Sequence, residues 1–275
     1  MKTDSTNAIL HSYYYNFDAA GNRVSEQVDS TVTQATPNNL NQLVGLSAGG
    51  PTRFQGTLSQ PGTVTVNGKA AFQSTSTNFV ANPTLSGGTN TVSVVATNGN
   101  GAAQTNQYQV VLPSAATITP AYDADGNMTS NGNGQTYAWD AENRLISITQ
   151  GGNTYQFAYD ALGRRVSETD NGTLATQWIW CGTEMCEERD GSNTVTKRFY
   201  PEGEQIGSSS YYYTRDHLGS VRELTDSTGA IQARYDYDPF GRATPRPGLQ
   251  PLRLPVRRLL PARRHRPQPH PLPRL

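Results

Sequence analysis

The sequence has 275 residues, of which 35% are hydrophobic and 16% charged, and it is rich in Gly, Asn, Ser and Thr. Few windows place apolar residues at helical spacing and no run of about 20 apolar residues occurs, which excludes a helix bundle and a membrane-spanning helix. The composition is typical of turn-rich β-structure. The formal net charge of the chain is zero, but its two parts differ in charge. The residues through Thr244 hold 14 basic and 22 acidic side chains, a net charge of −8.

The amino-terminal stretch "MKTDSTNAIL" lacks the apolar segment of a signal peptide. The first strands begin in the middle of their pattern. We therefore expect a fragment of a longer protein, whose export signal, if it has one, lies upstream.

A short motif recurs along the chain, in which an aromatic-Asp pair is followed by Gly or Asn and then, in most copies, by Arg. The copies comprise Phe17, Asp18, Gly21 and Arg23; Tyr122, Asp123 and Gly126; Trp139, Asp140, Asn143 and Arg144; Tyr159, Asp160, Gly163 and Arg164; and Tyr237, Asp238, Gly241 and Arg242. The middle three begin 17 and 20 residues apart. A period of this size indicates a stack of repeats.

Each copy of the motif predicts the turn of a β-hairpin. The aromatic residue ends a strand on its apolar side, and the Asp carboxylate caps the turn by accepting bonds from backbone N–H groups. Gly or Asn adopts positive φ, and Arg begins the return strand, where it can pair with Asp. The return strands "RLISITQ" and "RRVSETD" alternate along their length. Each hairpin therefore supplies half a core, and its neighbours supply the other half.

The motif is interrupted by a long insert, since no Asp or Glu occurs from Ser30 to Ala121. The segments "GTVTVNGKAAF", "NTVSVVATNGNG" and "NQYQVVL" predict strands joined by Asn-Gly turns. We expect a compact Ig-like β-sandwich over residues 52–113, flanked by linkers. Such modules are usually spacers. The alternative is a carbohydrate-binding role, for which the insert offers the aromatic residues Phe54, Phe72, Phe79 and Tyr108.

A longer match begins at Tyr211 with "YYYTRDHLGSVRELTDSTGAIQARYDYDPFGR". With the turn motifs, it resembles the YD repeats of the RHS family and the opening of the RHS-associated core, over roughly residues 11–35 and 120–242. The residues that carry the core resemblance are Asp216, His217, Gly219, Tyr237, Asp238 and Gly241. The resemblance implies a long sheet of repeats that winds into a hollow shell and commonly encloses a toxic domain encoded after the core. It also implies a secreted or cell-surface bacterial protein, with upstream YD repeats and a downstream toxin domain as partners.

Three patterns suggest chemistry but are better explained by the turns. "DADGN" from Asp123 has the residue types of a calcium loop, yet its Gly and closing acid do not match EF-hand spacing. Asp216, His217 and Ser220 have the residue types of a hydrolase triad but lie within five residues, so we expect Asp216 to cap a turn and His217 to pack between strands. Relatives cleave themselves at a later Asp-Pro-x-Gly motif, which is absent after Asp238, so we do not expect self-cleavage.

Cys181 and Cys186 are the two cysteines of the chain. They cannot form a four-ligand zinc site alone. A turn at residues 182–184 would bring them close enough for a disulfide, and two free, half-buried thiols are the alternative.

The tail from Pro245 to Leu275 holds 9 Pro, 8 Arg and 7 Leu and no acid. It contains no turn motif and no alternation of apolar and polar residues, and we expect it to be disordered. Synonymous codons can be chosen for His265–Leu275 that, displaced by one base, read as the Thr-Gly-Leu…Leu-Tyr-Arg-Ala string expected from the resemblance to an RHS core, so we interpret the tail as a frameshift or truncation after Arg242. The alternative is a genuine basic, Pro-rich tail that binds nucleic acid or an acidic surface.

The sequence therefore predicts a mainly β protein, an antiparallel YD-repeat sheet with an inserted Ig-like β-sandwich. The expected parts are YD-repeat strands over 1–45, the insert over 52–113, repeat hairpins over 118–210, the start of the core over 211–242 and a disordered tail over 243–275. We expect a non-enzymatic shell segment with no metal, cofactor or nucleic-acid partner. The alternative is a surface adhesin that binds a surface glycan through the insert.

Overall fold

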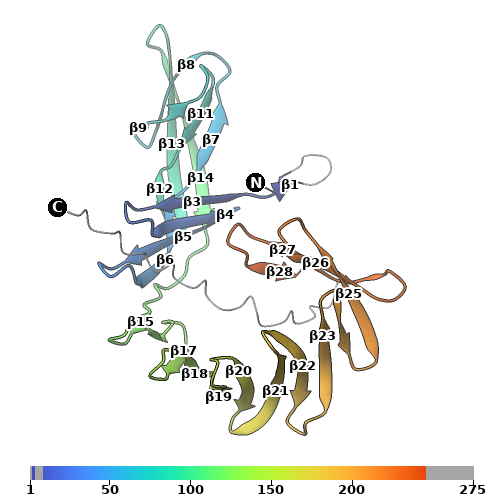
Figure 1. The fold of residues 1–275 in the computed structure, drawn as a ribbon. Helices are drawn as coiled ribbons and strands as arrows, with labels where there is room; N and C mark the ends of the chain where they lie inside the picture. The colour runs from blue at the N-terminus through green and yellow to red at the C-terminus, as the bar shows by residue number, and fades with distance from the viewer. Residues whose placement is uncertain (1, 4–8, 246–275) are drawn as a thin grey trace, which may run out of the picture. The chain divides into compact units, whose positions relative to one another are not determined.

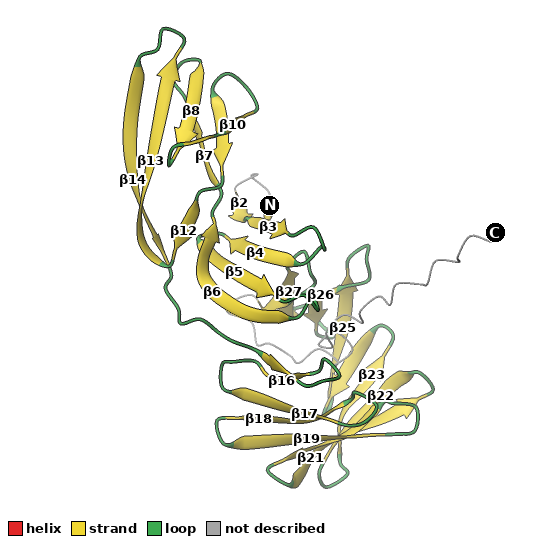
Figure 2. Cartoon of the chain, turned by 90° about the vertical axis from the view of Figure 1, so that its left-hand side faces the viewer, coloured by secondary structure: helices red, strands yellow, loops and turns green. Residues whose placement is uncertain are grey.

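The computed structural model describes residues 2–3 and 9–245 of the chain. All regular structure in this part is β-strand, as Figure 2 shows, and it contains no helix able to cross a membrane. Every strand pairing in it is antiparallel, for example β19 with β20 and β5 with β6. The mainly β, antiparallel fold class is thus confirmed. The tail predicted to be disordered over 243–275 begins too early, because Ala243–Pro245 form a strand that pairs with residues 235–237, and the rest of it lies outside the described residues.

The amino-terminal strands form a sheet of their own. A small pair precedes it, β1 (Lys2–Thr3) with β2 (Ile9–His11). The main sheet has the order β12-β6-β5-β4-β3 and consists of β3 (Tyr13–Phe17), β4 (Arg23–Val28), β5 (Thr31–Pro37), β6 (Leu43–Pro51) and β12 (Thr84–Ser86). Residues 84–86 belong to the expected insert but pair with residues 49–51 of β6. The predicted YD-repeat sheet is therefore divided, because the first hairpins lie in a sheet that they share with residues 84–86 and the later hairpins lie in another.

The middle of the chain forms two further sheets. One has the order β10-β11-β7, made of β7 (Phe54–Thr57), β10 (Phe72–Gln73) and β11 (Asn78–Ala81). The other has the order β14-β13-β8-β9, made of β8 (Gly62–Val66), β9 (Lys69–Ala70), β13 (Gly88–Asn98) and β14 (Ala103–Leu112). Their buried side chains share one core, in which Val64, Phe79 and Val92 meet Val32 of β5. The Ig-like assignment of this module stays a prediction.

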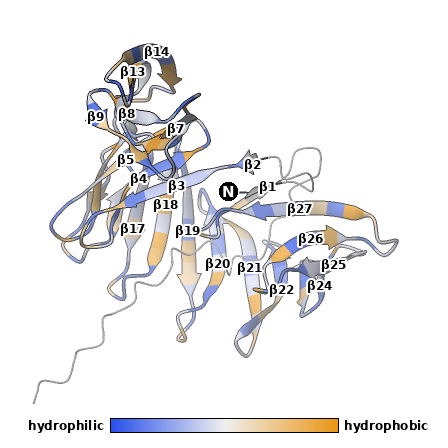
Figure 3. Cartoon of the chain, turned by 90° about the horizontal axis from the view of Figure 1, so that it is seen from above, coloured by the Kyte–Doolittle hydropathy of each residue, from blue (hydrophilic) through white to orange (hydrophobic). Residues whose placement is uncertain are grey.

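The repeat region supplies fourteen strands that neighbour one another in chain order, from β15 to β28 (Figure 1). They are β15 (Ala121–Tyr122), β16 (Met128–Ser130), β17 (Gln135–Trp139), β18 (Leu145–Gln150), β19 (Asn153–Tyr159), β20 (Arg165–Asp170), β21 (Thr173–Cys181), β22 (Glu184–Asp190), β23 (Val195–Tyr200), β24 (Gly203–Ile206), β25 (Ser209–Arg215), β26 (Val221–Thr225), β27 (Ile231–Tyr237) and β28 (Ala243–Pro245). Hydrophobic and hydrophilic bands alternate along many of them (Figure 3). Each strand thus pairs only with its sequence neighbours, as expected for repeats.

The chain divides into two compact units, Met1–Trp178 and Ile179–Leu275, with the boundary inside β21. The first unit holds the insert core described above. In the second unit, Leu224, Ala233 and Tyr235 are buried, and tyrosines of β25 and β27 pack against them. Each unit therefore has its own apolar cluster.

Candidate functional site: the stapled repeat turns

The repeat turns share one hydrogen-bond pattern, which the turn at Asp140 illustrates. The Asp140 carboxylate Oδ1 accepts bonds from the backbone N–H groups of Glu142 (3.1 Å) and Arg144 (2.9 Å). The Asp140 N–H donates to the Arg144 carbonyl (3.0 Å), and the Asn143 N–H donates to the Asp140 carbonyl (3.0 Å). Asn143 has φ 58°, the left-handed region that Asn tolerates better than most residues. One carboxylate oxygen therefore satisfies two turn N–H groups that no strand partner could reach.

The same four bonds recur far beyond the aromatic-Asp copies. Turns with the complete pattern begin at Asp18, Asn38, Asn98, Asp123, Asp140, Asp160, Asp190, Asp216, Asp226 and Asp238. The residue three positions later is Gly or Asn with positive φ in each of them. Asn can replace Asp because its side-chain oxygen accepts the same two bonds.

The second carboxylate oxygen of the motif Asp binds the start of the return strand. Nε of Arg144 donates to Oδ2 of Asp140, and Nε of Arg164 donates to Oδ2 of Asp160, each at 2.7 Å. Arg242 donates to Asp238 in the same way. The hydrogen bonds from the Arg164 side chain and backbone hold the pKa of Asp160 below its ordinary value. The Asp160 carboxylate is therefore ionised at neutral pH, and both of its oxygens accept hydrogen bonds.

The Tyr or Trp of the motif links its turn to an earlier one. The Tyr159 hydroxyl donates to the carbonyl of Leu145 at 2.7 Å, and Leu145 is the first residue after the Asp140 turn. The equivalent bonds join Trp139 Nε1 to Met128 (2.8 Å), the Tyr237 hydroxyl to Val221 (2.7 Å) and the Tyr122 hydroxyl to Leu43 (2.9 Å). In each pair the acceptor lies five residues after the residue that opens an earlier turn, which is Asp140 for Tyr159, Asp123 for Trp139, Asp216 for Tyr237 and Asn38 for Tyr122. We call this bond the aromatic staple.

The staple at Tyr122 spans the insert. Leu43 follows the Asn38 turn of the first sheet, 79 residues before Tyr122. The backbone of Ile118 also pairs with Leu46, with N–H to carbonyl distances of 2.8 and 2.9 Å. The first turn after the insert therefore docks on the last turn before it.

Asparagine amides add a second link between some neighbouring turns. Asn22 Nδ2 donates to Asn41 Oδ1 at 2.8 Å, and Asn127 Nδ2 donates to Asn143 Oδ1 at 2.7 Å. In both pairs the donor closes one turn and the acceptor is the positive-φ residue of the next. The positive-φ Asn thus has a function that Gly could not supply.

The second unit contains a buried carboxyl group, that of Glu204. Glu204 is 2% exposed, its Oε2 accepts a bond from the Tyr213 hydroxyl (3.2 Å), and its Oε1 has no partner among the described residues. Burial raises the pKa of Glu204, and Lys197 acts in the opposite direction. Burial next to Glu204 also raises the pKa of Tyr213, and burial raises that of Tyr235 to about 12. A buried, under-satisfied carboxyl is costly when ionised, and no sequence signal distinguished Glu204 from the exposed acids.

Cys181 ends β21 and Cys186 lies in β22, on opposite sides of a turn in which Gly182 has φ 64°. The structure joins them as a disulfide with a Cα–Cα distance of 5.7 Å, inside the range that the bond requires. The oxidised state in the protein stays a prediction.

The remaining candidate residues lie apart from any reactive arrangement. Asp216 caps its turn through bonds from the N–H groups of Leu218 and Ser220, so its carboxylate does not orient an imidazole. His217 was expected to pack between strands, but it occupies the second position of this turn and its side chain is exposed. No group of three His, Cys, Asp or Glu side chains suited to a metal occurs among residues 2–3 and 9–245.

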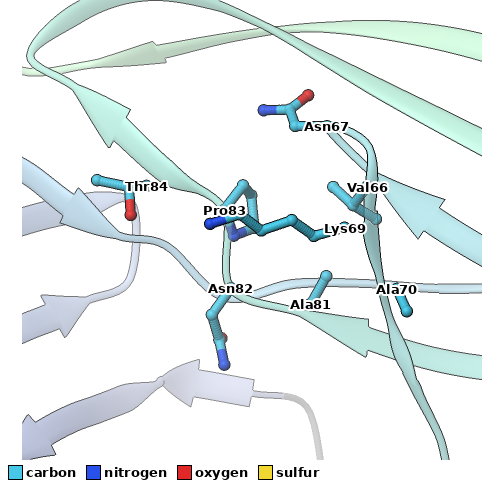
Figure 4. Close-up of a pocket in the computed structure, with 8 residues that line it drawn as sticks. All are labelled: Val66, Asn67, Lys69, Ala70, Ala81, Asn82, Pro83 and Thr84. Carbon is cyan, nitrogen blue, oxygen red and sulfur yellow. The ribbon is translucent and has the colours of Figure 1, made fainter.

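A depression in the insert also lacks a reactive arrangement of side chains. It is lined by Val66, Asn67, Lys69, Ala70, Ala81, Asn82, Pro83 and Thr84, and Figure 4 shows the Lys69 side chain extending across it toward Pro83. None of these residues is an acid, a histidine or a cysteine, so Lys69 has no partner there for proton transfer.

Comparison with known proteins gives one family match and several relatives. A family model described as Teneurin YD-shell matches residues 96–245. The tRNA3(Ser)-specific nuclease WapA of Bacillus spizizenii and the tRNA nuclease WapA of Bacillus subtilis strain 168 are each 30% identical over 135 residues, which is 45% of this chain and 6% of either relative. The tRNA(Glu)-specific nuclease WapA of Bacillus subtilis subsp. natto is 29% identical over the same length. The match thus spans a small part of these relatives.

The aromatic staple leads to a first prediction. Replacing Tyr159 by Phe keeps the ring but removes the donor to Leu145, so we expect the free energy of unfolding to fall by about 1 kcal/mol. Chemical denaturation measures it. Tyr200→Phe is the matched control, because Tyr200 is 53% exposed and lies outside the staple pattern. Equal effects of the two substitutions would contradict the staple.

The buried carboxyl leads to a pH-dependent prediction. The folded-state pKa of Glu204 is raised, so its contribution to stability is present below the unfolded pKa of about 4.3 and is lost as pH rises through the folded value. Glu204→Gln mimics the protonated form. We expect the variant and the wild type to be similar near pH 4, and the variant to gain about 1–3 kcal/mol by pH 8. The exposed neighbour Glu202→Gln should show no such gain, and a gain that shrinks with pH would refute the assignment.

The cysteine pair leads to a third prediction. On reduction the intact protein should gain the mass of two hydrogen atoms, and its free energy of unfolding should fall by about 2 kcal/mol or less, since short loops gain least from closure. Cys186→Ser should reproduce the fall and remove the effect of reductant. An unchanged mass would show that the thiols are free.

Proposed function

The chain belongs to the Teneurin YD-shell family, and from that premise we propose that its repeat strands are a structural segment of a protein shell that encloses a carboxy-terminal effector. The match confirms the resemblance to YD repeats that the turn motifs predicted. It covers residues 96–245, which include all the aromatic-Asp copies after the insert.

One observation carries the proposal: from β15 to β28 each strand neighbours the next in chain order. Such a sheet can extend by adding further hairpins. The aromatic staples add side-chain links between turns, because Tyr122, Trp139, Tyr159 and Tyr237 each donate to the carbonyl that follows an earlier turn. The relatives, of which the match covers 6%, leave ample length for further repeats and for an effector.

We propose that activity resides in the effector and that this segment is non-enzymatic. The WapA relatives are named as tRNA nucleases, which makes a nuclease one candidate for the effector. The segment itself, with a net charge of −8 through Thr244, would repel phosphate backbones. At Asp238 burial acts to raise the pKa, but the bonds from Arg242 outweigh it and the pKa lies below its ordinary value, which does not suit an acid in self-cleavage.

A secreted or cell-surface location of the longer protein agrees with this function. An effector that acts on other cells must leave the producer. The Cα–Cα distance of 5.7 Å between Cys181 and Cys186 suits a disulfide, and disulfides persist outside the cytosol.

Glycan binding through the insert is the second candidate. Phe72 is 72% exposed, and Tyr108, 45% exposed, stands edge-on to Phe54 at a centroid distance of 5.5 Å. Exposed aromatic faces of this kind can stack on sugar rings. A glycan array probed with the full chain, with Tyr108→Ala and Phe72→Ala as variants, tests it: retained binding in both variants, or none in the wild type, would exclude this role.

The enclosure is tested on the longer gene product that contains this segment and the coding region after it. We expect the portion after the repeats to resist protease in the intact product and to be cleaved when produced alone. Joint Tyr159→Phe and Tyr237→Phe substitutions, which remove two staples, should increase its cleavage rate, whereas Tyr200→Phe should not. Equal cleavage of the portion in the intact product and alone would contradict enclosure.

A further inference from the structure

Strand β14 presents a long free edge. It runs over ten residues, Ala103–Leu112, and pairs with β13 on one side, while no strand among the described residues pairs with its other side. Figure 2 shows β14 at the outside of its sheet. The residues from Ala103 to Gln109 are all exposed. This edge therefore carries a row of backbone N–H and C=O groups turned to solvent.

The other sheet edges in the described part of the chain are much shorter. Edge strands β3, β7, β9, β10, β12, β15 and β28 have between two and five residues. A short edge is one of the usual protections against pairing with another chain, and charge, Pro and β-bulges are the others. β14 has none of them: "AQTNQYQVVL" contains no charge and no Pro, and its ten pairs with β13 run without a register shift.

The turn before β14 fixes which of its backbone groups are free. The Asn98 N–H donates to the carbonyl of Ala102, so the carbonyl of Ala102 points toward β13. Backbone groups alternate in direction along an antiparallel strand. The N–H and C=O groups of Ala103, Thr105, Gln107, Gln109 and Val111 therefore point to the free edge.

We propose that β14 pairs antiparallel with β14 of a second copy of this chain. A two-fold axis at Gln107 places Thr105 opposite Gln109 of the other copy and Ala103 opposite Val111. These are the residues with outward backbone groups, so the two strands can exchange hydrogen bonds along the whole edge. The two four-stranded sheets would then form one sheet across both copies.

The side chains of β14 fit a second copy better than an unrelated charged strand. β14 has no charged side chain that would attract a strand of opposite charge. In a pair of two β14 strands, no like charges would repel each other. Asn106 and Tyr108 face each other across the axis, and the Gln107 amides meet on it, where each both donates and accepts. Val111, 64% exposed, and Tyr108, 45% exposed, lose apolar surface to water in the pair.

Sedimentation of the full chain over a range of concentrations tests the proposal. We expect the mass to rise from 29.9 kDa toward twice that value. Gln107→Lys places two ammonium groups opposite each other and should raise the dissociation constant at least about tenfold. Thr105→Pro removes an outward N–H without removing a bond to β13 and should have the same direction of effect. Thr84→Lys, on the three-residue edge β12, is the matched control and should leave dissociation unchanged.

Hydrogen exchange on the wild type gives a readout that needs no variant. The amides of Thr105, Gln107 and Gln109 should exchange more slowly as the concentration rises, while those of Gln104 and Asn106 should be protected throughout. A mass of 29.9 kDa at all concentrations would overturn the proposal. So would dimers that Gln107→Lys and Thr84→Lys affect equally, because the copies would then meet at another surface. Neither result bears on the shell function, which depends on β15–β28.

Discussion

The hydrogen bond from a motif Tyr or Trp to the carbonyl after an earlier turn is the side-chain interaction that joins the motif turns to the rest of the sheet. A β-hairpin with one apolar face cannot hold itself in place, since isolated two-stranded units are marginal in water. The turn cap orders a single hairpin. The Tyr159 hydroxyl and its equivalents hold the motif turns against an earlier turn of the sheet. The ring also buries apolar surface, so one side chain provides both packing and register.

This constraint explains why an insert is tolerated. The staple requires only that the aromatic of one turn reach the carbonyl after another, and it does not require the two turns to be close in sequence. Tyr122 meets Leu43 across 79 residues, and the Leu46–Ile118 bridge continues the contact. The module between them has its own core, centred on Val64, Phe79 and Val92. The insert therefore leaves the repeat contact intact, although β12 and Val32 tie its sheets to the first hairpins.

The sequence predicted the local turn well and the contacts between turns poorly. Asp caps and positive-φ Gly or Asn follow from the chemistry of a few adjacent residues, so the motif at Asp140 or Asp160 was enough. The turns at Asn38, Asp190 and Asp226 lack the preceding motif aromatic and were missed, although an Asp or Asn three residues before Gly or Asn would have found them. The side chains of the acceptors Leu43, Leu145 and Val221 do not identify them, because a backbone carbonyl is the same in every residue, and their constant distance from a turn-opening residue became clear from the structure. Burial of Glu204 likewise depends on what neighbouring strands cover.

Phe17 shows that the turn itself does not need the polar atom of the motif aromatic. Its ring has no polar atom to donate, and it is 54% exposed. The Asp18 turn after it is nonetheless complete, with both carboxylate bonds and both backbone bonds in place. The turn therefore forms from Asp and the positive-φ residue alone, while the polar atom of Tyr or Trp is needed only to join one turn to the next. The backbone hydrogen bonds between neighbouring strands set the spacing of the hairpins from β15 to β28, including those at Asp190 and Asp226 that have no motif aromatic. The polar atom of Tyr or Trp adds a side-chain link between turns to that ladder.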